Sequence, residues 1–151
     1  MQYQAPTQQF TEAQPGTSQA VVEAVDTGNS GMWRITWSIV SVTQNKGSYV
    51  FLTKKNATPI FIVNMRIIDE HQNECTSKVM GVAAAKIFNI TAAQFRQHEF
   101  NENIAALQAT FDQIDTAAAR SFVIKVTKND FTGEFEAQCI SITWIFHFSC
   151  V

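Results

Sequence analysis

The 151-residue sequence lacks the features that mark several large classes of protein. No run approaches the roughly 18 consecutive apolar residues that a membrane-spanning helix needs, so no membrane span is encoded. The sequence also has no glycine-rich phosphate-binding loop, no HExxH sequence and no nucleophile elbow. We therefore expect a protein that is not an enzyme, with no catalytic residues, no cofactor and no membrane partner.

Cysteine is scarce, and its distribution predicts free thiols. The three cysteines, Cys75, Cys139 and Cys150, are widely spaced and odd in number. The first ten residues, MQYQAPTQQF, do not have the basic start and apolar core of a secretory signal. We therefore expect reduced cysteines in a reducing compartment rather than a disulfide framework.

The stretch DEHQNEC at residues 69–75 gathers side chains from which a metal or catalytic site could be built. It lies between two apolar runs and has the right length for a hairpin connection. Adjacent residues of one turn point in different directions, whereas metal ligands must converge from rigid elements. His98 and His147 are isolated, so no second group of ligands lies at the required spacing. We predict a polar turn and no metal site.

Acidic and basic residues are unevenly distributed along a chain whose formal net charge is −2. Residues 31–68 carry five basic residues and no acid, whereas residues 69–119 carry seven acids and three basic residues. The net charge alone argues against a nucleic-acid binder, but the distribution predicts one positive and one negative face. The alternative, a scattering of solvated charges, stays open from the sequence alone.

The composition predicts one globular domain behind an N-terminal tail. With 46% hydrophobic and 16% charged residues, the chain is long enough for a single hydrophobic core. Residues 1–22 are rich in Gln, Thr, Ala and Pro without an apolar period, so we expect a disordered tail there and the domain at residues 23–151. A short strand is expected at residues 21–25.

Alternation of apolar and polar residues, the period of a half-buried strand, recurs along the chain. The segments that show it are WRITWSIVSV, IFIVNMRII and ECTSKVM in the first half, and SFVIKVTK and FEAQCISITWIFHF in the second. The phase slips at Val40 and again near Cys139, which predicts bends in the first and last strands. The same alternation favours the barrel interior for Trp33, Trp37 and Trp144 over a ligand-binding face.

A helical segment interrupts the strands. Residues 82–95 and 101–117 are Ala-rich with apolar residues at helical spacing, which predicts two helices with a break at residues 96–100 and a cap at Thr91. Three strands, a helical insertion and two strands, with bent first and last strands, are typical of a five-stranded OB barrel. Another small barrel or an α+β sheet stays open, but the position of the helices favours the OB fold.

These segments resemble the C-terminal OB domain of the replication protein A large subunit. The resemblance covers residues 32–146 and includes Ile87-Phe88-Asn89 and Ala92-Ala93; the stretch RSFVIKV at residues 120–126 is the specific part, since it matches the family's RSFIFRV strand. It implies a nuclear protein that binds single-stranded DNA within a heteromeric complex of OB-fold subunits.

Two departures from the family pattern limit what the resemblance implies. The family inserts a four-cysteine zinc ribbon between its first two barrel strands, where this chain has TKKNATP without Cys or His, so no zinc is expected. The family often has a base-stacking aromatic residue on the third strand. That position falls at or near Thr76, and no aromatic residue lies between Ile68 and Phe88.

An OB barrel binds single strands on the face of its second and third strands and in the loops that join strands 1–2 and 4–5. The residues of this chain expected at those places are Lys46, Lys54, Lys55, Arg66, Lys78, Lys125, Lys128 and Phe131. Arg66 is the strongest candidate because it interrupts an apolar strand on its polar face, and Phe131 is unusual for a turn. For any one basic residue the alternative is an ordinary solvated side chain.

Two interpretations follow for the function. In the first, the protein is a single-stranded DNA-binding OB subunit of a complex like replication protein A, serving replication, recombination or telomere maintenance. In the second, it is an assembly module that docks partner subunits with little DNA contact. The positive segment and the family resemblance favour the first interpretation. The missing third-strand aromatic residue, the absent zinc ribbon and the negative net charge favour the second.

Overall fold

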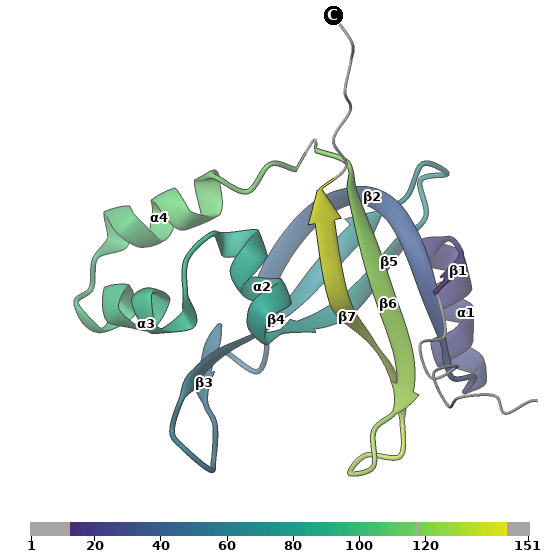
Figure 1. The fold of residues 1–151 in the computed structure, drawn as a ribbon, viewed down its shortest axis with the longest axis horizontal. Helices are drawn as coiled ribbons and strands as arrows, with labels where there is room; N and C mark the ends of the chain where they lie inside the picture. Colours follow the sequence, from purple (N-terminus) through teal and green to yellow (C-terminus); the bar gives the residue numbers. More distant parts are fainter. Residues whose placement is uncertain (1–12, 117, 145–151) are drawn as a thin grey trace, which may run out of the picture.

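The computed structural model describes residues 13–116 and 118–144. Its strands are β1 (Gln14–Pro15), β2 (Gly31–Gln44), β3 (Val50–Leu52), β4 (Pro59–Ile68), β5 (Glu74–Met80), β6 (Arg120–Lys128) and β7 (Phe135–Trp144). Its helices are α1 (Ser18–Thr27), α2 (Gly81–Phe88), α3 (Ala92–Phe100) and α4 (Ile104–Asp112). Figure 1 shows the strands curving into a barrel, with α1 on one side and the helices α2, α3 and α4 on the other.

Five strands close the barrel in the order β2–β6–β7–β5–β4, and β4 returns to pair with β2. Strands β5 and β7 run parallel, and the other pairs of the ring are antiparallel. Along the chain, the helical insertion lies between β5 and β6, which are the third and fourth of the five ring strands in sequence order. This confirms the predicted OB fold. The short strands add to the ring from outside, β1 on β2 and β3 on β4.

The long strand β2 closes the barrel by pairing with two neighbours in succession. Its first half, through Trp37, pairs with β6, and its second half, from Ser38, pairs with β4. The register shifts between Ile39 and Ser41, so one extra residue bends the strand where it changes partner. The bulge predicted from the phase slip at Val40 is therefore confirmed.

Strand β7 has a similar irregularity. Val123 of β6 pairs with Ser141, and the next residue, Ile124, pairs with Cys139, so Ile140 is an extra residue in β7. The change of phase near Cys139 predicted it. Bulges of this kind increase the twist that lets a small sheet close on itself.

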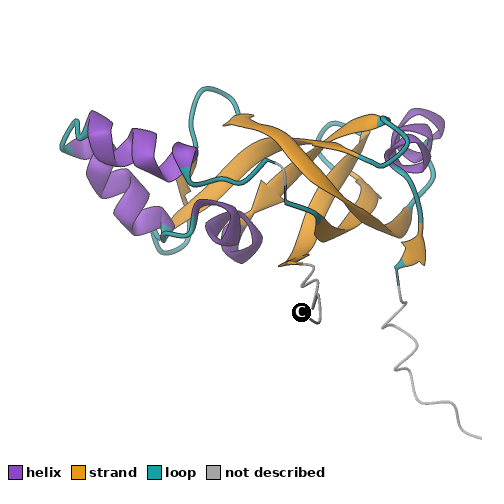
Figure 2. Cartoon of the chain, turned by 90° about the horizontal axis from the view of Figure 1, so that it is seen from above, coloured by secondary structure: helices purple, strands orange, loops and turns teal. Residues whose placement is uncertain are grey.

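The hydrophobic core fills the barrel and continues beneath the helices at both ends. The strands contribute fully buried residues such as Ile35, Val63 and Ile124, while Val21 of α1 and Ile87 of α2 enter from opposite ends. The view from above in Figure 2 also shows α1 separated from the three inserted helices by the width of the sheet. The barrel is therefore closed at two sides by helices, which leaves its strand faces and hairpins for contacts.

An aromatic cluster joins the inserted helices to the barrel. Its members are Tyr49, Phe61, Phe88, Phe95 and Phe111, with neighbouring ring centroids 4.7–6.3 Å apart. Tyr49 immediately precedes β3, so the cluster ties that strand to α2, α3 and α4. Aromatic pairs at these separations contribute about 0.5–1.5 kcal/mol each beyond their buried area.

The insertion has three helices where the sequence predicted two. Helix α2 ends at Phe88, and its C-cap Asn89 adopts the left-handed conformation. Thr91 then caps α3, so the helical segment is interrupted at residues 89–91. The predicted break at residues 96–100 is wrong, because those residues complete α3. The cap at Thr91 is confirmed: its hydroxyl accepts from the Gln94 N–H, and the Gln94 side chain accepts from the Thr91 N–H.

The N-terminal segment differs from the prediction. The strand expected at residues 21–25 is wrong, because Thr17 caps a helix there and Gly28 ends it in the left-handed conformation. Val21 and Ala24 lie on the buried side of that helix, and this packing outweighs the preference of valine for strands. Residues 14–22, predicted as part of the tail, form β1 and the first half of α1, while residues 1–12 lie outside the described residues.

The polar turn at residues 69–73 is confirmed, and it anchors α1. The buried Asp69 carboxylate accepts backbone N–H groups from His71 and Asn73 within the turn, and from Ser18 at the start of α1. Burial alone would raise the pKa of Asp69, but these hydrogen bonds outweigh burial and lower it. The carboxylate also lies at the N-terminal, positive end of the helix dipole.

Two of the three tryptophans can be placed. Trp33 and Trp37 are half-buried and pack against the core, as the alternation in β2 predicted. Trp33 also lies against the backbone of Gly16 and Gly31, where an added Cβ would come within 2.5 and 2.6 Å of its ring. The side chain of Trp144 lies outside the described residues.

Candidate nucleic-acid interface

The outer face of β4 and β5 carries a continuous polar patch, called here the β4–β5 face. The odd-numbered residues 61–67 of β4 are buried, so Asn64 and Arg66 point outward, as do Thr76 and Lys78 on β5. The strand register sets Arg66 opposite Thr76 and Asn64 opposite Lys78. Directly opposed side chains on one face are neighbours, so these four groups can act on one ligand.

Both basic residues of this face are held by carboxylates. The Arg66 Nη2 atom lies 2.6 Å from Glu74 Oε2, and the Lys78 Nζ atom lies 3.5 Å from Glu136 Oε2. All four side chains are partly exposed, and ion pairs of this kind contribute only about 0–1 kcal/mol. Each cation can therefore exchange its carboxylate for a phosphate at small cost, while the pairing orients it on the face.

The hairpin between β6 and β7 presents Phe131 to solvent. The Asn129 side chain accepts from the backbone N–H groups of Phe131 and Thr132, which fixes the turn, and it donates to Glu136 Oε1. Since Glu136 also pairs with Lys78, the hairpin is linked to the β4–β5 face. The Phe131 side chain is 100% exposed, so nothing in the described part of the chain covers this ring.

The hairpin between β3 and β4 presents Lys54 and Lys55. Both are exposed in a turn that is closed by hydrogen bonds from Thr58 N to Thr53 Oγ1 and from Thr53 N to Thr58 O. This hairpin and the β6–β7 hairpin project in the same direction from the barrel (Figure 1). The two predicted loops thus bring lysine side chains and an exposed aromatic ring to the same end of the molecule.

The remaining predicted residues are less closely grouped. Lys125 on β6 and Lys78 on β5 are each the register partner of Gln138 on β7, so the three side chains form a row across the barrel. Lys128 is exposed at the base of the β6–β7 hairpin. Lys46 is exposed in the Asn45–Ser48 turn between β2 and β3, apart from the tip that carries Lys54 and Lys55.

Sequence reasoning missed Phe51 as a site residue. Phe51 is the register partner of Ile60, which places it on the same outward side of the sheet as Arg66. It is half-exposed and lies outside the core cluster. The base-stacking aromatic residue of the family that the sequence resembles has no counterpart at Thr76, whereas Phe51 supplies an aromatic face on the neighbouring hairpin. The register of β3 against β4, which the sequence does not give, is the information that reveals it.

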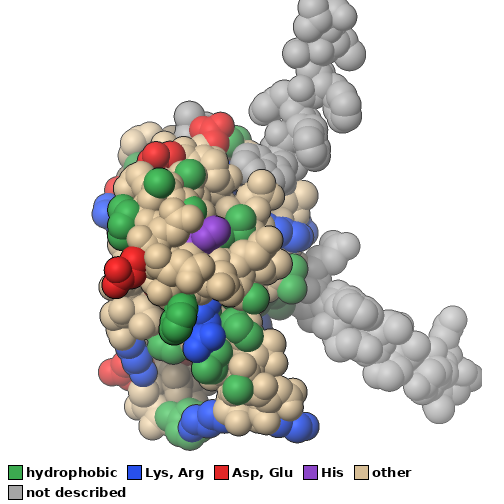
Figure 3. Space-filling view, turned by 90° about the vertical axis from the view of Figure 1, so that its left-hand side faces the viewer, with side chains coloured by type: hydrophobic (Ala, Val, Ile, Leu, Met, Phe, Trp, Pro, Cys, Tyr) green, Lys and Arg blue, Asp and Glu red, His purple; other side chains and the backbone are tan. Residues whose placement is uncertain are grey.

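Charged side chains are unevenly distributed on the side of the molecule that carries the inserted helices. On the side seen in Figure 3, most Lys and Arg side chains lie in the lower half, toward the end from which the hairpins project in Figure 1. The acidic Glu99, Glu102 and Asp112 lie on or between α3 and α4 instead. Next to these acids, Phe100 and Ile104 are 83% and 70% exposed. The helical tip thus has exposed acidic and apolar side chains, beside the single arginine of α3, Arg96.

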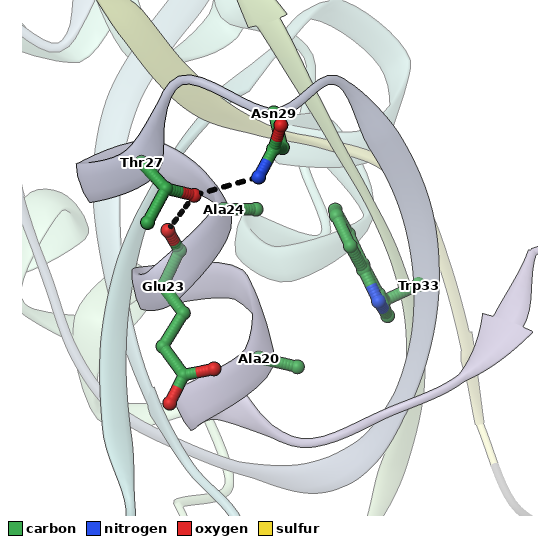
Figure 4. Close-up of a pocket in the computed structure, with 6 residues that line it drawn as sticks. All are labelled: Ala20, Glu23, Ala24, Thr27, Asn29 and Trp33. Carbon is green, nitrogen blue, oxygen red and sulfur yellow. Dashed lines mark hydrogen bonds between the residues drawn. The ribbon is translucent and has the colours of Figure 1, made fainter.

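A hollow of about 400 Å³ lies between α1 and β2, beside Trp33 (Figure 4). Thr27 lines it together with Asn29, whose side-chain amide donates to the Thr27 hydroxyl, which in turn donates to the Glu23 carbonyl. None of the predicted site residues lines this hollow, and its charged side chain is the acidic Glu23. The hollow is therefore not part of the candidate nucleic-acid interface.

The two described cysteines are buried thiols. Burial raises the pKa of Cys75 to about 11 and that of Cys139 to about 12, so both thiols are protonated at neutral pH. Within residues 13–116 and 118–144, no three His, Cys, Asp or Glu side chains are grouped so as to hold a metal ion. No helix of this described part is long and apolar enough to cross a membrane.

Comparison with known proteins identifies the fold. No protein-family model and no curated protein matches the sequence. Among solved structures, the chain is similar to one from a replication protein A heterotrimer bound to ssDNA, with a TM-score of 0.66 and 11% identity, covering 89% of this chain and 37% of that one. It is also similar to a chain in the crystal structure of fission yeast Pot1 and Tpz1, with a TM-score of 0.56 and 8% identity, covering 89% of this chain and 94% of that one.

Proposed function

We propose that this protein is a single-stranded DNA-binding OB-fold subunit of a nuclear complex like replication protein A, without catalytic activity. The observation that carries the proposal is the pair of hairpins that project from one end of the barrel beside the β4–β5 face. One hairpin supplies Lys54 and Lys55, and the other supplies the fully exposed Phe131. The fold shared with a chain of a replication protein A heterotrimer bound to ssDNA supports it.

The proposed binding mode follows from the chemistry of a single strand. Its bases offer flat apolar faces, and stacking on an aromatic side chain contributes about 1–3 kcal/mol per base. Phe131 and Phe51 are the aromatic groups on or beside the β4–β5 face. The phosphates of the single strand are neutralised by lysine and arginine with release of counterions. We assign this phosphate contact to Arg66, Lys78 and the hairpin lysines. Asn64 and Thr76 are polar partners on the same face.

Fluorescence anisotropy of a labelled single strand of about 20 nucleotides, titrated at two salt concentrations, tests the proposal. We expect salt-sensitive binding that Arg66→Ala weakens about 3- to 30-fold, in line with a charge-assisted hydrogen bond. The matched control is Arg34→Ala, because Arg34 is an exposed arginine on the β2–β6 side of the barrel. An equal loss of affinity for the single strand in both variants, or no binding by the wild-type protein at low salt, would contradict the proposal.

A second function is favoured by the helical tip. Phe100 and Ile104 are exposed where α3 meets α4, and Figures 1 and 2 both place these helices at the far side of the molecule from α1. Large exposed apolar side chains at one site are typical of a contact with another protein. We propose that this tip attaches the domain to another subunit of its complex.

Site-specific photo-crosslinking separates the two functions. A photo-reactive amino acid placed at Phe131 is expected to form adducts with single-stranded DNA, and one placed at Phe100 is expected to form adducts with protein. Both side chains are exposed, so neither replacement should disturb the fold. Nucleic-acid adducts at Phe100, or protein adducts alone at both positions, would contradict this division of the surface.

A further inference from the structure

Two adjoining hollows form a groove along α2, called here the α2 groove. The first, of about 200 Å³, lies between the start of β4 and α2 and includes Ile60, Val82 and Ala85. The second, of about 350 Å³, continues from Val82 and Ala85 to Lys86. Thr91 also borders both hollows, so the groove is continuous from β4 to the outer side of α2.

The α2 groove begins where the β4–β5 face ends. Ile60 points outward on the same side of β4 as Asn64 and Arg66. On β5, Met80 is the register partner of Ile62, and the next residues of the chain enter α2. A single-stranded nucleic acid that follows the outward residues of β4 from Arg66 toward Ile60 therefore reaches this groove without turning away from the surface.

The one charged side chain that lines the two hollows is basic. It belongs to Lys86, and the other lining residues, such as Asn89 and Gln94, are uncharged. The floor of the groove is apolar, and Val82 at its centre is 76% exposed. An apolar floor with a lysine at its border is complementary to a ligand that has apolar faces and negative charges.

We propose that the α2 groove extends the nucleic-acid path: bases of the strand leaving the β4–β5 face pack over Val82 and Ile60, and Lys86 contacts a phosphate beyond them. This inference rests on the proposed function and adds a second subsite to it. An apolar peptide would also cover Val82, but it would gain nothing from the charge of Lys86. The charge therefore favours a single strand as the occupant.

The test compares short and long oligonucleotides. A strand of about 6 nucleotides fills the β4–β5 face, and one of about 15 nucleotides also reaches the groove. We expect the wild-type protein to bind the longer strand at least about tenfold more tightly. Val82→Glu and Lys86→Ala should each reduce the affinity for the longer strand, by about tenfold and threefold, and leave the affinity for the shorter strand unchanged.

The matched control is Val22→Glu, which places the same charge on an exposed valine of α1 at the other end of the barrel. Thermal unfolding of each variant checks that the fold is intact. Two results overturn the inference while the proposed function stands. In the first, the wild-type protein binds the longer strand no more tightly than the shorter one. In the second, Val82→Glu does not reduce the extra affinity for the longer strand. If the wild-type protein binds neither strand, the proposed function fails and the inference fails with it.

Discussion

Arg66 and Glu74 form an ion pair across the β4–β5 hairpin, with 2.6 Å between Arg66 Nη2 and Glu74 Oε2. The pair is diagonal, because the register partner of Arg66 is Thr76. The guanidinium is thus oriented on the outer face by a carboxylate that lies at one side of it. A phosphate approaching the face would have to displace this carboxylate, which makes Glu74 a competitor of the ligand.

Replacing this competitor should strengthen binding. In Glu74→Gln the amide no longer neutralises Arg66, so we expect the affinity for single-stranded DNA to rise about two- to fivefold, the range of an exposed ion pair. Anisotropy titration at low salt measures the change. Glu70→Gln removes an equal charge from the same turn without touching Arg66, and an equal rise in that variant would contradict a specific role for Glu74.

The hairpin lysines should set part of the salt dependence. Each phosphate contact to a single strand contributes about 0.7 to the slope of log K against log salt concentration, so Lys54→Ala with Lys55→Ala should reduce that slope by about 1.4. Titrations at several sodium chloride concentrations give the slope. Asn56→Ala in the same turn is the control, and an unchanged slope in the double lysine variant would mean that this hairpin does not meet the backbone.

Phe131 should contribute to binding and not to stability. Because its ring is fully exposed, Phe131→Ala should leave the melting temperature unchanged while reducing binding by about 1–3 kcal/mol, the contribution of one stacked base. Phe131→Trp should retain binding, and Phe131→Leu should retain little of it, because stacking needs an aromatic face. If leucine serves as well as tryptophan, the ring does not stack on a base.

Asp69 should make the stability of the fold sensitive to acid. Its pKa is lowered in the folded protein, so its contribution is fully present above the ordinary value of 3.8 and is lost as the pH falls through the folded pKa. We expect Asp69→Asn to cost about 1–3 kcal/mol of unfolding free energy at neutral pH and much less near pH 2. Urea denaturation at both pH values measures this, with Glu70→Gln as an exposed control from the same turn.

The fold could be predicted because its signals are local. Alternation along β2, β4 and β6, the phase slip at Val40 and the Thr91 cap each express a local rule that the packed barrel also obeys. The helix at Ser18–Thr27 could not be predicted, because Val21 and Ala24 become helical through burial against strands distant in sequence. Its anchor, the hydrogen bond from Ser18 N to Asp69, spans 51 residues.

The candidate site was only partly readable for a related reason. The residue types at Arg66 and Phe131 were informative, because a charge inside an apolar strand and a phenylalanine in a turn break local rules. The carboxylate partners, Glu74 and Glu136, and the outward position of Phe51 depend on strand register. Register is fixed by pairing across the barrel, which no local pattern encodes.

The most direct test is to map the binding surface by NMR, following backbone amide shifts as a single strand of about 15 nucleotides is added. We expect the largest changes on β4 and β5 around Arg66 and Lys78 and on the two projecting hairpins, while the α3–α4 tip around Phe100 stays unchanged. Changes confined to that tip, or no changes at saturating DNA, would contradict the proposed DNA-binding surface.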